Sequence, residues 1–166
     1  MGIRGIEDDL MDTRLFFETW DASHRLTRQT LESFPAETLG QRIIPGMRSP
    51  GELFGHIVAH TRTAFDACLR RRVDTRESYE PPPTLDCASK PDLLLYSRQV
   101  MEMAFAHANQ APEVWKQTIE TPWGCESMET ICVEAFSHEV HHRGQLYVML
   151  RKLGITPPPF CSHERH

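Results

Sequence analysis

Two pairs of histidines are the residues in this sequence best suited to chemistry. His56 and His60 form the first pair, and His138 and His142 form the second, within the string His-Glu-Val-His-His-Arg-Gly-Gln. Because the members of each pair are four residues apart, both imidazoles of a pair project from the same face of a helix. Rings from two such helices can share one divalent cation, and burying them without a common partner would be costly. The spacing therefore predicts a metal site.

The residues by themselves leave the choice of ligands open. His138 and His142 share a face and are the predicted ligands of the second pair, whereas His141 is rotated by about 100° from its neighbour. That rotation places His141 on another surface or behind a ligand. Either His56 or His60 then completes a three-histidine site, with open positions left for water or substrate.

Two other metal chemistries fit the same string less well. Residues 138–142 satisfy the HExxH pattern of zinc proteases, but only a helix end and a Pro-rich tail follow His142, where such enzymes take a further ligand from a larger domain. A ferritin-like di-iron site needs two ExxH motifs and bridging glutamates, and Glu139 to His142 supplies one ExxH alone. We therefore predict a mononuclear site.

The hydrophobic pattern predicts an all-α four-helix bundle. Apolar residues recur at helical spacing, and clusters of Pro and Gly divide the chain into long segments. The predicted helices span residues 7–33, 50–72, from 89 or 91 to 108, and 127–153. The apolar stripe predicted for the first of them consists of Leu10, Leu15, Phe16, Trp20, Leu26 and Leu31.

Helix caps and connections follow from local residue types. Ser49 is a predicted N-cap, with Glu52 completing a capping box, and either Ser127 or Thr130 is predicted to cap the last helix. The Pro-rich stretch over residues 75–90 predicts a long crossover connection. Residues 114–124, rich in β-branched and aromatic side chains, predict a short extended segment or hairpin before the last helix.

Composition favours one soluble domain. The 166 residues are 40% hydrophobic and 25% charged, which is ordinary for a globular protein. A net charge of -5 without a lysine-rich arm argues against a nucleic-acid partner, and no segment approaches the ~20 apolar residues of a membrane span. The five dispersed cysteines are predicted to be reduced thiols. We expect a cytoplasmic protein with one domain over residues 1–156 and a flexible Pro-rich tail over 157–166.

Two motifs resemble those of the DinB/YfiT-like family of metal-dependent enzymes. The string over residues 138–145 is similar to that family's HExHHRGQ signature, and residues 48–57 resemble the opening of its second helix. The resemblance implies an up-up-down-down-like four-helix bundle that holds a divalent metal. It implies His56, His138 and His142 as the ligands, with His60 one turn away, either behind a ligand or on the substrate side.

The resemblance also implies an activity. Neutral nitrogen ligands leave a cation its full charge, which lowers the pKa of bound water or thiol. The family implies an S-transferase that uses a low-molecular-weight thiol, or a hydrolase, acting on a small-molecule substrate. We expect zinc or nickel, with iron or manganese as alternatives. The candidate catalytic residues are His60, Glu134 and His141.

Two non-enzymatic interpretations stay open. In the first, the protein is a stress-response module whose metal only joins the two histidine helices. In the second, a metal-free bundle forms a homodimer through the apolar sides of its helices. A closed coordination shell without a cavity would favour a structural metal, whereas an open pocket would favour catalysis.

Overall fold

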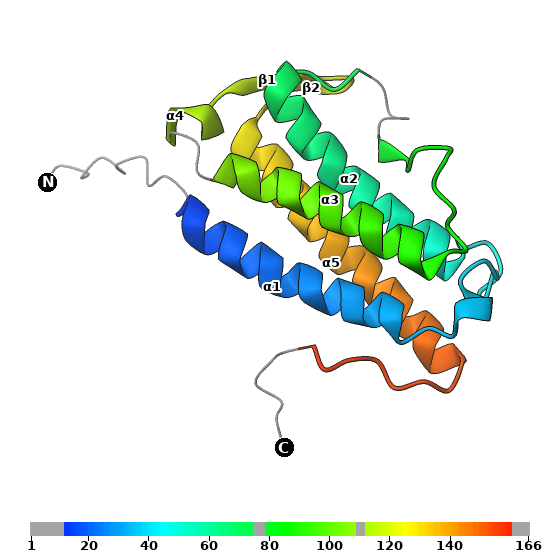
Figure 1. Ribbon diagram of the computed structural model, residues 1–166. Coiled ribbons are helices and arrows are strands. Elements are labelled where there is room, and N and C mark those ends of the chain that lie inside the picture. The colour runs from blue at the N-terminus through cyan, green and yellow to red at the C-terminus, as the bar shows by residue number, and fades with distance from the viewer. Residues whose placement is uncertain (1–11, 75–78, 109–111, 161–166) are drawn as a thin grey trace, which may run out of the picture.

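The computed structural model describes residues 12–74, 79–108 and 112–160. Its main elements are four long helices that lie side by side (Figure 1), namely α1 (Thr13–Glu32), α2 (Pro50–Arg70), α3 (Lys90–Ala108) and α5 (Met128–Lys152). The shorter elements are a 3-10 turn (Ala36–Thr38), helix α4 (Pro112–Trp115), and strands β1 (Thr118–Thr121) and β2 (Gly124–Ser127). The predicted all-α bundle and the extended segment before its last helix are confirmed.

The directions of the four helices differ from those expected. Following the colours in Figure 1, α1 and α5 run one way along the bundle, and α2 and α3 run the other way. The order is up-down-down-up, so the expected up-up-down-down order was wrong. The reason is that the long crossover joins α2 to α3 and makes them parallel, whereas an up-up-down-down bundle has its long connections before and after that pair.

Ser49 and Ser127 are the N-caps of the two helices that carry the histidines. The Ser49 hydroxyl accepts a hydrogen bond of 3.2 Å from the backbone N–H of Glu52. The Glu52 carboxylate in turn accepts one of 2.8 Å from the backbone N–H of Ser49, which completes the capping box at the start of α2. At α5, the Ser127 hydroxyl accepts from the backbone N–H of Thr130 at 3.0 Å. These bonds satisfy N–H groups that the first helical turn leaves without partners.

Two helix boundaries differ by more than one residue from those predicted. The expected start of the first helix at Glu7 lies outside the described residues, and α1 begins at Thr13. Helix α2 ends at Arg70 rather than Arg72 because Arg71 adopts a left-handed conformation with a φ of 57°. From there the backbone pairs with β1 instead of continuing the helix.

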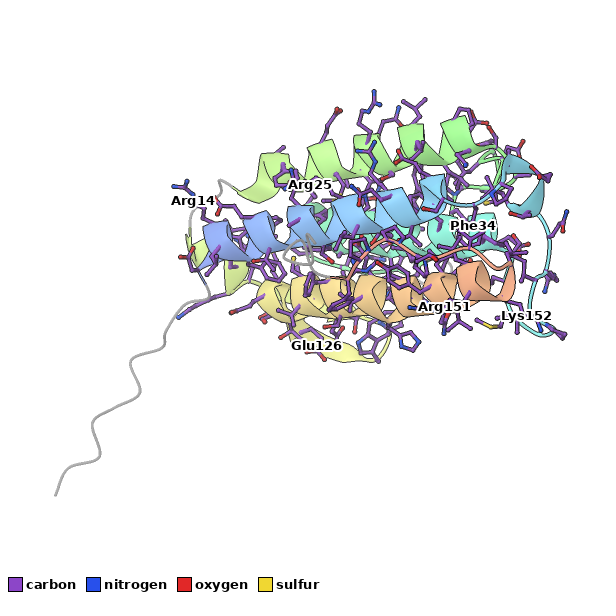
Figure 2. The ribbon with its side chains drawn as sticks, turned by 90° about the horizontal axis from the view of Figure 1, so that it is seen from below. Arg14, Arg25, Phe34, Glu126, Arg151 and Lys152 are labelled. Atoms are coloured by element: carbon purple, nitrogen blue, oxygen red, sulfur yellow. The ribbon has the colours of Figure 1, made fainter. Side chains whose placement is uncertain are left out.

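Two apolar clusters fill the bundle, one toward each end. The cluster at the hairpin end is rich in aromatic rings and includes Phe17, Trp20, Phe65 and Trp115. The cluster at the opposite end includes Leu31, Phe34, Phe54 and Leu146. Figure 2 shows Arg14 and Lys152 projecting away from the bundle, near its two ends. Leu15, predicted to face the core, is 60% exposed, so the predicted stripe of the first helix was wrong at that position.

Two predictions made from the composition can be compared with the structure. The described cysteines are free thiols, as predicted, and they are Cys68, Cys87, Cys125 and Cys132. Cys161 lies outside the described residues. None of the helices in the described part of the chain has the length and apolar character that a membrane span requires.

The crossover packs closely on the first turn of α2 at Gly51. A Cβ atom at this position would lie 1.7 Å from the carbonyl oxygen of Cys87 and 3.2 Å from that of Leu39. The Gly51 N–H donates to the same Leu39 carbonyl at 3.0 Å. Because even a methyl group has no room here, glycine is required, and the close contact anchors the crossover against α2.

We expect Gly51→Ala to lower the free energy of unfolding by about 2–3 kcal/mol, because the added methyl displaces the crossover backbone. Gly144→Ala is the matched control, since its Cβ meets open space on the surface of α5. That substitution should raise stability by about 0.5–1 kcal/mol through helix propensity. Urea unfolding of both variants measures the difference, and equal effects would contradict the close contact.

Candidate metal centre

Three histidines from two helices meet between α2 and α5. Potential ligand nitrogens of His56, His138 and His142 all lie within 4.8 Å of one another, and the three residues are half-buried. The Nε2 atoms of His56 and His138 are 3.2 Å apart. Two nitrogens bound at about 2.0–2.1 Å to a tetrahedral cation would be separated by about 3.3 Å. The observed spacing therefore suits a shared metal ion.

Hydrogen bonds hold two of the three rings with Nε2 free to bind. His56 Nδ1 donates to the backbone carbonyl of Tyr79 at 3.1 Å, and His142 Nδ1 donates to Gln145 Oε1 at 2.8 Å. Each bond places the proton on Nδ1 and leaves the lone pair on Nε2. In the described part of the chain, the buried Nδ1 of His138 finds no hydrogen-bond partner. The donor set thus consists of three imidazoles, two of them oriented by hydrogen bonds, which could bind a divalent metal ion.

The same environment keeps these imidazoles neutral. Burial, together with the neighbouring imidazoles, lowers the pKa of His138 to about 2 and that of His60 to about 4. Burial is also the main cause that lowers the pKa of His56 and of His142. Neutral imidazole is the form that binds a metal, so the site needs little deprotonation at neutral pH.

Glu80, on the crossover, places a carboxylate beside His56. Its Oε1 lies 3.5 Å from His56 Nδ1, and its two oxygens accept hydrogen bonds of 2.7 and 2.9 Å from Arg48. The sequence analysis missed Glu80, because a polar residue in a Pro-rich connection has no periodicity that marks it. The only signal available was the motif at the start of the second helix, which includes Arg48.

A pocket of about 420 Å³ opens beside the histidine cluster. Its lining consists of His56, His60, Tyr79, Glu80, Trp123, Glu134 and His138. His60 stacks on His138, with ring centroids 3.8 Å apart and 19° between the planes. The structure thus brings two candidate catalytic residues, His60 and Glu134, to the pocket. It places the third, His141, on the exposed surface of α5, where its Nε2 lies 3.2 Å from Gln145 Nε2.

Glu139 lies on the opposite side of α5, inside the bundle. Its Oε2 accepts from Trp20 Nε1 at 2.9 Å, and its Oε1 accepts from Thr27 Oγ1 at 2.6 Å and lies 3.1 Å from His24 Nδ1. Burial alone would raise the pKa of Glu139, but His24 and these hydrogen bonds lower it. A zinc-protease glutamate must face the metal, so this geometry agrees with the rejection of the HExxH interpretation.

The same buried network ties α5 to two other helices. Arg143, one turn after Glu139, donates to the backbone carbonyl of Ser23 at 2.8 Å and to its hydroxyl at 2.6 Å. His24 Nε2 lies 2.7 Å from the hydroxyl of Ser97 on α3. Because the bonds of Glu139 and Arg143 go to α1, they set the rotation of α5 about its axis and direct His138 toward α2, while His24 extends the network from α1 to α3.

The family of the chain follows from comparison with known sequences. A sequence model of the DinB family matches residues 10–165. This chain belongs to the DinB family. The resemblance seen in the two motifs is therefore confirmed. Among curated proteins, none matches the chain.

Solved structures of DinB-like proteins share the fold over 87% of this DinB-family chain. A DinB-like protein from Bacillus subtilis has a TM-score of 0.71 at 16% identity, with 96% of that chain covered. One from Bacillus cereus has a TM-score of 0.67 at 21% identity, with 94% covered. A DinB-family structure from Exiguobacterium sibiricum has a TM-score of 0.63 at 23% identity, with 94% covered. At these identities the likeness shows the fold.

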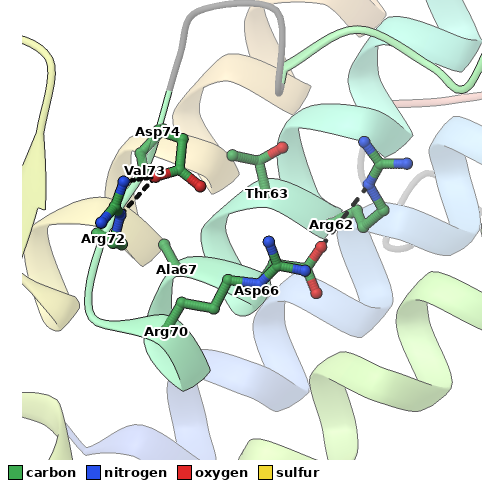
Figure 3. A pocket seen from close by; sticks show the side chains of 8 residues that line it. All are labelled: Arg62, Thr63, Asp66, Ala67, Arg70, Arg72, Val73 and Asp74. Carbon is green, nitrogen blue, oxygen red and sulfur yellow. Dashed lines mark hydrogen bonds and ion pairs between the residues drawn. The ribbon is translucent and has the colours of Figure 1, made fainter.

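The DinB-family bundle has a second, charged pocket at the C-terminal end of α2 (Figure 3). Its volume is about 320 Å³, and its lining consists of Arg62, Thr63, Asp66, Ala67, Arg70, Arg72, Val73 and Asp74. Arg72 forms an ion pair with Asp74, and Arg62 lies 4.0 Å from Asp66. Arg70, the remaining charged residue, lies in the last turn of α2, where a positive charge suits the negative end of the helix dipole. Since the pocket shares no lining residue with the histidine pocket, we place no chemistry here.

We expect Glu139→Ala to lower the free energy of unfolding by about 3–5 kcal/mol, because it leaves His24, Trp20 and Thr27 without their buried acceptor. Glu102→Ala, on the exposed side of α3, is the control and should change stability by less than about 0.5 kcal/mol. Chemical denaturation measures both. A Glu139 variant as stable as the control would show that the network does not hold α5.

The metal-free protein should lose stability as the pH falls below about 6.5, the ordinary histidine pKa. The folded state keeps His60 neutral down to a pKa of about 4, so the unfolded chain takes up protons first and is favoured by acid. Replacing His60 with Phe keeps a ring but removes this titration, and we expect a flatter pH dependence of unfolding.

The matched control for the pH experiment is His141→Phe, which changes an exposed histidine of α5. It should leave the pH dependence as in the wild type. Urea unfolding at several pH values between about 4 and 7 measures the slopes. Parallel slopes for wild type and His60→Phe would contradict the burial of a neutral His60.

Proposed function

We propose that this protein is a mononuclear metal-dependent enzyme that activates a low-molecular-weight thiol or water toward a small electrophilic substrate. The reaction is of the S-transferase or hydrolase type. The observation that supports it is the convergence of three neutral imidazoles, from His56, His138 and His142, beside a pocket of about 420 Å³. Such a pocket has room for a small substrate next to the cation.

The residues around the cluster have distinct tasks in this proposal. A divalent cation bound by the three histidines would lower the pKa of a thiol or water molecule and supply a nucleophile near neutral pH. The Tyr79 carbonyl and the Gln145 amide hold the rings of His56 and His142, so that their Nε2 lone pairs point to the cation. Orientation of the ligands in advance reduces the cost of binding.

Glu134 is the proposed proton acceptor. It lies one turn before His138 on α5 and lines the pocket. Burial, and secondarily the charge of Glu126, raises the pKa of Glu134, which makes its carboxylate a stronger base than an ordinary glutamate. His60 is less suited, because its pKa of about 4 makes it a weak base, and its stacking on His138 supports the ligand ring instead.

The metal and the thiol are part of the proposal. An all-nitrogen donor set favours zinc or nickel, with iron or manganese as alternatives. A structural metal that only joins α2 to α5 is the rival function. The pocket beside the ligands supports catalysis over that rival, because a closed structural site needs no adjoining cavity.

Protein purified without a histidine tag should contain about one equivalent of metal per chain, measured by elemental analysis. His56→Ala, His138→Ala or His142→Ala should each reduce that content to about one tenth or less, because each removes one of three ligands. His141→Ala is the control and should retain the metal, since its ring lies on the exposed surface. A triple variant that keeps the full metal content would overturn the proposal.

The metal-loaded protein is then screened for thermal stabilisation by thiols such as glutathione, bacillithiol and mycothiol. An enzyme with an open coordination position should be stabilised by at least one thiol in proportion to its affinity. A structural metal predicts no such shift. The Glu134→Gln variant should retain the metal and should still be stabilised by the thiol, because the proposed task of the Glu134 carboxylate is proton transfer rather than binding of metal or thiol.

A further inference from the structure

The outer wall of the histidine pocket is aromatic. Trp123, in the turn between β1 and β2, is 46% exposed. Its ring lies 5.9 Å from that of Tyr79, with 36° between the planes. Tyr79 in turn lies 4.4 Å from the ring of His60. These rings form a continuous surface that leads from the solvent to the stacked pair of His60 and His138.

The aromatic wall of the pocket carries a net negative charge. The Glu80 carboxylate is neutralised by its two hydrogen bonds from Arg48. Glu134 is different, since no lysine or arginine forms an ion pair with it among the residues that the structure describes. Glu126 adds a second carboxylate nearby, close enough to act on the pKa of Glu134, and it lies at the lower edge of the bundle in Figure 2.

Aromatic faces and a free carboxylate together are the chemistry that recognises alkylammonium groups. The face of a Trp or Tyr ring attracts a cation through its quadrupole, and desolvation strengthens the attraction. The phenol of Tyr79 is neutral at neutral pH, as phenols ordinarily are, and burial raises its pKa further, to about 12. Tyr79 therefore offers a ring face rather than a competing charge.

We propose that this pocket binds substrates that carry an alkylammonium group, which lies against Trp123, Tyr79 and Glu134. The inference rests on the proposed metal-dependent function, because the reactive end of such a substrate would reach the histidine cluster. The stacked rings lead in that direction, from Trp123 to His138. An anionic group in the same place would face Glu134 and Glu126, and an uncharged group would forgo the attraction of both the rings and the carboxylate.

Three small probes of the same shape test the charge preference. Choline carries a trimethylammonium group, neohexanol carries an uncharged tert-butyl group in its place, and tert-butylacetic acid carries the tert-butyl group and is anionic at neutral pH. Isothermal titration with the full-length protein, both metal-free and zinc-loaded, measures their affinities. We expect choline to bind about tenfold more tightly than neohexanol in both forms, and the anion to bind most weakly in the metal-free form, where no zinc is present to bind its carboxylate.

Substitutions in the aromatic wall test whether it causes the preference for choline over neohexanol. Glu134→Gln should reduce the preference for choline over neohexanol to about threefold or less, and Trp123→Leu should also weaken choline binding. Glu102→Gln is the matched control, because it removes the same charge from the exposed side of α3. It should leave the preference unchanged. Both site variants alter partly exposed side chains, and circular dichroism confirms their folding.

Several results would overturn the inference. Equal affinity for choline and neohexanol, tighter binding of the anion to the metal-free protein, or a choline preference that survives Glu134→Gln would each do so. Zinc content measured in the same samples separates this inference from the proposed function. Retained zinc without a choline preference contradicts the alkylammonium inference alone, whereas a choline preference in protein that binds no zinc contradicts the metal function alone.

Discussion

The rest of the structure depends on the buried hydrogen bonds that the Glu139 carboxylate accepts. One carboxylate binds Trp20, His24 and Thr27 of α1, and Arg143 binds the same helix one turn further on. A buried charge must be satisfied on every side, so α5 has one favourable rotation. Neighbouring positions of that helix then face opposite ways. Glu139 faces the interior of the bundle, and His138 faces α2 and the pocket.

The site is assembled from segments that are far apart in the chain. Helices α2 and α5 supply the three histidines, the crossover supplies the Tyr79 carbonyl and Glu80, and the hairpin turn supplies Trp123. The crossover reaches its place because Gly51 lets its backbone approach α2 without a side chain between them. The rigid part of the site thus lies on helices, whereas the pocket wall lies on connections, where variation between relatives is tolerated most easily.

Sequence reasoning succeeded where the signal was local. The i,i+4 histidine pairs, the Ser49 capping box and the extended segment before the last helix depend on a few neighbouring residues, and the structure contains all of them. Reasoning failed where the partner was distant. Thr27 and His24 are buried although they are polar, and Leu15 is exposed although it is apolar. Hydrophobic periodicity assumes an apolar interior, so it cannot locate a helix face that is buried through hydrogen bonds to a carboxylate more than a hundred residues away.

The amino-acid sequence by itself determined that His138 and His142 share one helix face, because the geometry of the α-helix leaves no alternative at that spacing. It also determined the caps and the helical class, since both depend on interactions within a few residues. Spacing did not choose between His56 and His60, and the family motif only implied His56. The tertiary structure brings His56 within reach of one cation with the other two, and it turns Glu139 away from them. Those outcomes depend on the rotation and relative direction of whole helices. These are set by the contacts of α5 with α1 and α2 and by the path of the crossover, not by spacing along the chain.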